Sequence, residues 1–232
     1  YVTGSHALKA GWQYSEGFYR QVIVQNGNLQ QLYRNGVPYA VTVYNTPINA
    51  RTELSGDLGL YIQDAWTIKR LTLSPGIRFE KLKEGLPVQS APAGRFVPAR
   101  QFSAVECLPC WSDFVPRLGA AYDLFGTGRT AIKGSIGRYM DTDLFAFART
   151  YNPMVTSTHT RTWTDANRDD IAQDAELGPS TNANFGVRAN RNPDPDIKRP
   201  FQMLYSVGVQ QEVRSGISAS LFFYRRGYHR LI

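Results

Sequence analysis

An acidic stretch near residue 170 has the residue types and the spacing of a calcium-binding loop. Side-chain oxygens stand at positions 1, 3, 5 and 12 of such a loop, and the carbonyl of Ile171 stands at position 7. The side-chain ligands would be Asp165, Asn167, Asp169 and Glu176. Position 6, where glycine normally permits a sharp turn, is Asp170. An acidic surface loop built from Asx turns is therefore the favoured interpretation, and calcium is the alternative.

The two cysteines, Cys107 and Cys110, form a Cys-x-x-Cys motif. No βαβ pattern surrounds the motif, so a thioredoxin-like redox role is not indicated. A zinc site would need two further ligands, and the three histidines are scattered along the chain. In an oxidising compartment the motif predicts a local disulfide that braces the loop 84–112. Its closed loop is short, so its contribution to stability should be small.

No pattern in the sequence indicates catalysis. A Gly-x-Ser-x-Gly elbow, a Walker loop and a dinucleotide fingerprint are all lacking, and Asp194 and Asp196 lie in a turn-rich Asn-Pro-Asp-Pro-Asp stretch. We therefore predict that the chain is not an enzyme. Ligand capture is predicted for the segment 141–200, because binding groups concentrate on loops carried by a rigid scaffold. The residues there that combine aromatic surface with charge are Tyr151, Arg161 and Trp163.

The segments that must carry these loops show a two-residue alternation of apolar and polar side chains. From Leu71 to Phe79 every second residue is apolar, which gives a strand one apolar and one polar face. Seven such strands are predicted, at about 3–15, 57–68, 71–83, 113–124, 129–140, 201–213 and 217–226. Asp64 interrupts the apolar face of the second strand, which predicts a bulge or a position near a rim.

Length and connections distinguish these strands from those of most globular proteins. They run to about 11–13 residues, whereas globular strands average about 5–6 and a tilted membrane strand needs about 9–11. Tight joins at 69–70, 126–128 and 214–216 alternate with long loops at about 16–56, 84–112 and 141–200. Within 16–56, the segments 20–25, 29–34 and 39–44 predict a protruding β-extension with Asn-Gly turns. Short turns on one rim and long loops on the other are typical of a bacterial outer-membrane β-barrel.

Composition agrees with a barrel and argues against some other classes. Apolar residues make up 42% of the 232 residues, and the mean hydropathy of −0.35 argues against helical membrane spans. The net charge of +7 is spread along the chain without the basic block of a nucleic-acid tail, so no nucleic-acid partner is predicted. Four basic residues fall on polar strand faces: Lys9, Arg78, Arg117 and Lys133. A solvated face is the favoured interpretation, and a positive lumen that attracts anions is the alternative.

Several stretches resemble a known family. Residues 57–66 and 71–78, a strand ending in Tyr-x-Gln-Asp-x-Trp followed by a tight turn and a strand with Gly-x-Arg, resemble the barrel of TonB-dependent outer-membrane receptors. Residues 114–139 resemble the Oar-like subgroup, whose members carry an N-terminal carboxypeptidase-regulatory-like domain; residues 4–11 and 220–226 fit the same subgroup. The resemblance implies an antiparallel up-and-down transmembrane barrel in the bacterial outer membrane that takes up a scarce solute actively.

Seven strands do not close a bacterial single-chain barrel, in which strand numbers are even, and an open sheet would leave unpaired edges in lipid. We therefore expect residues 1–232 to be part of one barrel of roughly 22 strands, with the plug and the TonB box outside this sequence. The expected partners are outer-membrane lipid, the TonB complex through the plug, and a small solute or oligomer. The alternatives are a soluble or surface β-sandwich that binds carbohydrate or protein, and a passive porin.

Overall fold

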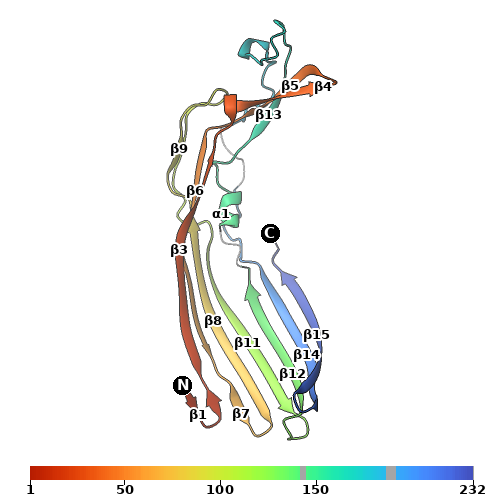
Figure 1. Ribbon diagram of the computed structural model, residues 1–232. Coiled ribbons are helices and arrows are strands. Elements are labelled where there is room, and N and C mark those ends of the chain that lie inside the picture. Colours follow the sequence, from red (N-terminus) through yellow and green to blue (C-terminus); the bar gives the residue numbers. More distant parts are fainter. Residues whose placement is uncertain (142–144, 187–191, 232) are drawn as a thin grey trace.

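The computed structural model describes residues 1–141, 145–186 and 192–231, and nearly all of their regular structure is β-strand. In these residues, seven long strands form one antiparallel sheet in the order β3–β6–β8–β11–β12–β14–β15 (Figure 1). Their bounds are β3 (Lys9–Ile23), β6 (Ile48–Gln63), β8 (Leu71–Gly85), β11 (Cys110–Asp123), β12 (Thr130–Met140), β14 (Phe201–Arg214) and β15 (Ile217–His229). The prediction of an all-β, antiparallel fold with long strands is confirmed.

The first predicted strand, 3–15, is broken in the structure. Two short strands, β1 (Val2–Thr3) and β2 (His6–Ala7), pair with each other around a turn at Gly4, whose φ of +44° favours glycine. The long strand β3 begins only at Lys9. The prediction of one continuous strand is therefore wrong at its first residues, because alternation of side chains does not reveal a glycine turn.

The interruption predicted at Asp64 is confirmed. The strand β6 ends just before it, and β7 (Trp66–Ile68) resumes pairing with β8 just after it. The N–H of Asp64 donates to the carbonyl of Pro75 (3.0 Å), and its carboxylate lies 2.6 Å from Nδ1 of His6. The register is the same on both sides of this interruption, so it is not a bulge; it lies near the end of the sheet that carries the tight turns, as the alternative of a position near a rim predicted.

The three tight joins lie together at that end, at the bottom of Figure 1. Lys69, Gly126, Gly128 and Gly216 have positive φ angles, as short hairpin turns require. The carboxylate of Asp123 accepts hydrogen bonds from the amides of Gly126 (3.0 Å) and Gly128 (2.8 Å). Local turn chemistry thus fixes the register of neighbouring strands at this end.

At the opposite end, the β3–β6 pair continues well beyond the other strands. Its pairing runs on to Ile23 and Ile48, so much of the predicted loop 16–56 is strand and the predicted segment 20–25 lies largely within β3. The remaining connection holds the 3₁₀ turn Asn26–Asn28 and the strands β4 (Leu29–Arg34) and β5 (Val37–Tyr44). These two strands confirm the predicted β-extension.

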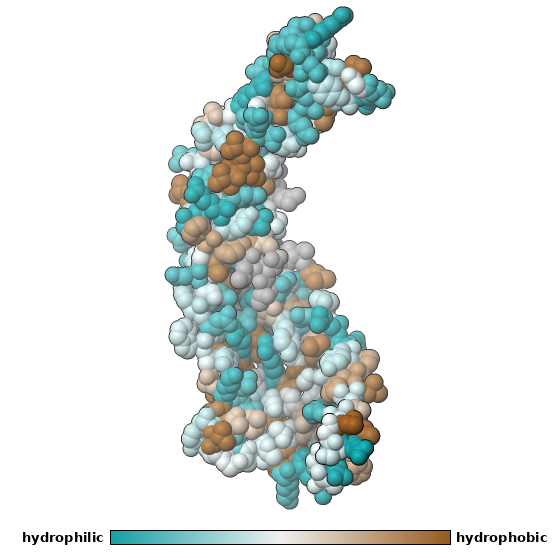
Figure 2. All heavy atoms as spheres, in the orientation of Figure 1, coloured by the Kyte–Doolittle hydropathy of each residue, from teal (hydrophilic) through white to brown (hydrophobic). Residues whose placement is uncertain are grey.

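A small folded unit, here called the tip, stands at the end of this extension. The strand β13 (Thr158–Thr162), from the segment 141–200, pairs with β5 and forms a three-stranded sheet with β4 and β5. Val41, Val43, Trp163 and Ala172 form its buried core. Its outer surface is mainly hydrophilic in Figure 2. The tip is therefore a packed structure rather than a set of free loops.

The other two predicted loops are also partly ordered. The loop 84–112 contains a hairpin of β9 (Gln89–Ala91) and β10 (Arg100–Phe102). The segment 141–200 contains α1 (Ala146–Thr150), β13 and the 3₁₀ turn Asp174–Glu176. In the described part of the chain, no helix is long and apolar enough to cross a membrane.

One face of the long sheet is apolar and exposed; we call it the apolar face. The register places Trp12, Leu60, Phe79 and Phe114 in one row across four strands. Further along the sheet, Val207 pairs with Phe223, and both side chains are largely exposed. Among the described residues, the buried hydrophobic clusters lie in the tip, beside its base and around α1, and none of them is formed by this face. The sheet thus presents an unpacked apolar surface, as a lipid-facing sheet does.

Candidate functional site

The opposite face of the long sheet carries charged side chains, and we call it the charged face. The strand register places charged residues on it that include Lys9, Arg78, Glu80, Asp113, Arg117 and Lys133. The four basic residues predicted to lie on polar faces therefore share a single face. Glu80 on β8 pairs with Asp113 on β11, toward the tip side of the sheet. Because these two neighbouring carboxylates repel each other, a cation beside them would stabilise the pair.

Arg199, from the segment just before β14, supplies that charge. The residue is only 2% exposed, and its Nη1 donates to Oε2 of Glu80 at 2.9 Å. Its Nε donates to the carbonyl of Asp141 at 2.7 Å. The other oxygen of Glu80 accepts from Nε of Arg78 at 2.8 Å. Because β11 and β12 separate β8 from β14 in the sheet, this contact ties the segment 141–200 across the charged face.

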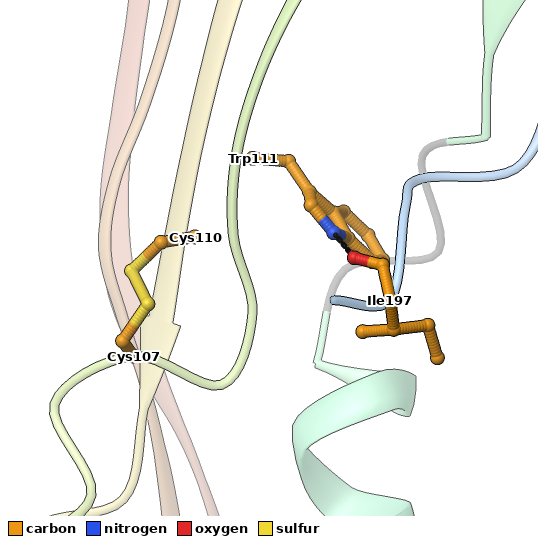
Figure 3. Close-up of a disulfide and its surroundings, with 4 residues drawn as sticks. All are labelled: Cys107, Cys110, Trp111 and Ile197. Carbon is orange, nitrogen blue, oxygen red and sulfur yellow. Dashed lines mark hydrogen bonds between the residues drawn. A yellow bond between two sulfur atoms is a disulfide. The ribbon is translucent and has the colours of Figure 1, made fainter. Parts of the chain in front are cut away.

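Trp111 holds the same segment at a second point (Figure 3). Its indole Nε1 donates to the carbonyl of Ile197 at 2.9 Å. Trp111 follows Cys110 directly, and the structure joins Cys110 to Cys107 by a disulfide. The disulfide turn therefore leads straight into the residue that anchors the chain two positions before Arg199.

Replacing both cysteines by serine is expected to lower the free energy of unfolding by about 2 kcal/mol or less, because the disulfide closes a very short loop. Urea unfolding of the double serine variant and of the unmodified full-length protein measures this change. The intact mass before and after reduction tests the bond itself, and two free thiols in the untreated protein would contradict it.

An aromatic group lies beside these anchors. Phe147 and Tyr151 are four residues apart along α1 and its C-cap, a spacing that brings side chains together on a helix. Their ring centroids are 4.9 Å apart, and that of Trp111 lies 5.2 Å from Phe147 in an edge-on arrangement. The N–H of Phe145 donates to Oε1 of the buried Glu84 at 2.9 Å, which fixes the start of α1 against β8.

The predicted calcium ligands lie in one exposed loop of the tip but accept hydrogen bonds from that loop. Oδ2 of Asp165 accepts from the N–H of Asp170 at 3.1 Å, and Oδ1 of Asp169 accepts from the N–H of Ile171 at 2.9 Å. Oδ1 of Asn167 accepts from the N–H of Asp169 at 3.1 Å. Such contacts are the Asx turns expected for an acidic surface loop, the interpretation that the sequence favoured. Among the described residues, no group of three or more His, Cys, Asp or Glu is placed to hold a metal ion. Calcium binding stays a prediction, which calorimetric titration of the full-length protein tests.

Glu176 closes this loop through its carboxylate. Its Oε1 accepts from the N–H of Ala166 at 2.9 Å, and its Oε2 accepts from the indole of Trp163 at 3.3 Å. Burial raises the pKa of the Glu176 carboxyl, but these hydrogen bonds outweigh burial and bring the pKa below its usual value. Because the folded pKa is the lower one, the stabilisation is present above the unfolded pKa and is lost as the pH falls through the folded pKa.

The loop should therefore lose protection in acid. Hydrogen exchange of peptides covering 164–177 in the full-length protein, corrected for the intrinsic pH dependence, is expected to show full protection at neutral pH and loss in acid. Glu176→Gln removes this titrating group and leaves the other carboxylates of the loop in place, so the variant's loss of protection in acid should be smaller than that of the unmodified protein. An unchanged acid transition in the variant would contradict this role of Glu176.

The three residues predicted to capture ligand do not lie together. Trp163 is 3% exposed and packs in the core of the tip, edge-on to Tyr33. The Nε of Arg161 donates to the carbonyl of Gly178 at 2.6 Å. Tyr151 lies apart from them, in the aromatic group beside α1. Trp163 and Arg161 therefore have structural contacts within the tip, and Tyr151 is the one placed beside the charged face.

Sequence reasoning missed Arg199, Trp111 and Phe147. Arg199 and Glu80 are 119 residues apart, so no local pattern connects them. Phe147 carried a detectable signal, because its four-residue spacing to Tyr151 is the spacing of neighbours on a helix. Trp111 was missed because an irregular loop was expected up to residue 112, whereas the strand β11 begins at Cys110.

Comparison with known proteins agrees with this architecture. The family model described as "Outer membrane beta barrel domain" matches residues 1–226, nearly the whole chain. A search of the curated proteins found no match. The family accounts for the exposed apolar face, because a sheet in the outer membrane turns such a face to lipid. The chain therefore belongs to the outer membrane beta barrel domain family, and its place is the bacterial outer membrane.

Proposed function

We propose that this chain is the barrel portion of a TonB-dependent outer-membrane receptor of the Oar-like type, which takes up a scarce solute actively. The observation that carries the proposal is the contrast between the two ends of the sheet. In the described residues, the joins between long strands at one end are tight turns, whereas the other end carries a packed tip and a segment tied back onto the charged face. Ordered connections of this kind suit ligand capture at the cell surface better than passive diffusion.

In this proposal the tip faces outward and the charged face lines the lumen. The sheet is open, since β3 pairs only with β6 and β15 only with β14 in the described residues. Unpaired edges are not viable in lipid, so further strands complete the barrel and a plug fills it. The family fits a transport or structural role without catalysis. The solute is released inward when the TonB complex acts on the plug.

Planar-bilayer recording with the full-length protein tests this proposal. A plugged receptor is expected to show no steady open-pore conductance, and the protein should bind the purified periplasmic domain of TonB. A steady ohmic pore together with no TonB binding would contradict the proposal and identify a passive porin instead.

A further inference from the structure

A cavity of about 490 Å³ lies between α1 and the tip-side ends of β8 and β11. Trp111, Phe147 and Tyr151, the aromatic group described above, line it together with Leu82 and Pro109. All three aromatic side chains are only partly buried, so their surfaces are accessible from the cavity. The cavity therefore offers a ligand three ring systems from two separate parts of the chain.

The charge of this cavity differs from that of the chain as a whole. The chain carries a net charge of +7, yet the titratable residues among the described lining residues are Glu84, Asp141 and Tyr151, with no lysine, arginine or histidine. Asp141 is exposed, and Glu84 is buried with Oε1 accepting from the N–H of Phe145. Aromatic faces carry negative potential and attract cations, and acidic groups add to that attraction.

We infer that this cavity binds an alkylammonium group, the aromatic rings surrounding its apolar substituents and the exposed carboxylate of Asp141 opposing its charge. That the imported solute itself carries such a group rests on the proposed receptor function. The volume admits a small organic cation with an apolar body. The ties from Arg199 to Asp141 and from Trp111 to Ile197 hold the two sides of the cavity in place.

Arg149 provides a matched control on the same helix. Its guanidinium lies 4.4 Å from the ring centroid of Tyr19, and it lines a different, smaller cavity on the other side of α1. Ala146 and Thr150 line both cavities, but the aromatic rings and acidic residues of the proposed site do not line the smaller one, so changing Arg149 alters charge on α1 without altering those groups.

Calorimetric titration of the full-length protein in detergent micelles tests the inference with two probes. Choline is a permanent alkylammonium ion, and 3,3-dimethyl-1-butanol has nearly the same shape without the charge. Choline is expected to bind at least roughly tenfold more tightly than the neutral alcohol. Equal binding of the two probes, or binding of neither, would overturn the inference.

Variants then locate the site. Tyr151→Leu and Asp141→Asn are each expected to weaken choline binding by roughly five- to tenfold, whereas Arg149→Gln should leave it within about twofold. Asp141→Asn keeps the backbone carbonyl that Arg199 uses, so a change in its affinity does not reflect loss of that tie. Choline binding unaffected by both site variants would place the cation elsewhere and overturn the assignment.

The TonB-binding assay separates this inference from the proposed function. A protein that binds TonB but not choline contradicts the cation site alone. A protein that binds choline through Tyr151 and Asp141 but does not bind TonB contradicts the receptor function and leaves the site intact.

Discussion

Arg199→Ala is expected to lower the free energy of unfolding of the full-length protein by about 3 kcal/mol, because it removes one of the two cations that pair with the buried Glu80. The guanidinium of Arg199 is almost fully buried and makes two hydrogen bonds at 2.7 and 2.9 Å, to the Asp141 carbonyl and to Glu80. Arg78 still pairs with Glu80 in the variant. The expected loss of stability is therefore at the low end of the values found when one partner of a buried ion pair is removed. Urea unfolding in detergent micelles measures the change.

A matched pair on the surface provides the control for this prediction. Arg129 and Glu212 are 3.9 Å apart, with Arg129 largely exposed and Glu212 partly exposed, so Arg129→Ala should cost less than about 1 kcal/mol. Adding Glu80→Gln to Arg199→Ala should recover part of the loss, because the buried carboxylate that keeps only Arg78 as its cation is then replaced by a neutral amide. Equal losses for Arg199→Ala and Arg129→Ala would show that the buried tie contributes nothing particular.

Val207→Arg is expected to destabilise the protein in lipid vesicles by about 2–4 kcal/mol, the cost of a cation on the lipid face near the middle of the bilayer. Val207 is 54% exposed on the apolar face, halfway along β14, and pairs with Phe223. Its neighbour Ser206 points to the charged face, where Oγ lies 2.7 Å from Oγ of Ser135. Ser206→Arg, the matched variant, should therefore cost much less.

Reversible urea unfolding of the full-length protein from lipid vesicles measures both arginine variants. The difference between neighbouring positions is the informative quantity, because the two variants share strand, depth and added charge. Similar losses at both positions would contradict a lipid-facing role for the apolar face.

The sheet was the most predictable part of this protein. The strict alternation from Leu71 to Phe79 predicted which residues share a face, and the turn residues at 126–128 predicted a tight join. Both signals are local, because a strand's faces and a turn's φ angles depend on a few consecutive residues. The continuation of β3 and β6 toward the tip was missed, since pairing there is not accompanied by a clean apolar face.

The site was harder to predict because its contacts join distant segments. Trp163 is of a residue type that often binds ligands, yet its ring is buried and packs in the core of the tip. Arg199 stands beside a proline in a polar segment, and only the fold brings it to Glu80. Tyr151 lies in the segment predicted to capture ligand, but its neighbours Trp111 and Phe147 emerged only from the packing of α1.

In the proposed arrangement, the long sheet is a wall of an outer-membrane barrel, with its apolar face in lipid and its charged face in the lumen. A nitroxide scan along β14, from Met203 to Gln210, in the full-length protein in lipid vesicles tests this arrangement. Accessibility to oxygen is expected to alternate with a period of two residues. The high values should fall at Met203, Tyr205, Val207 and Val209. Uniform accessibility to a water-soluble relaxation agent along the strand, with no alternation, would contradict it.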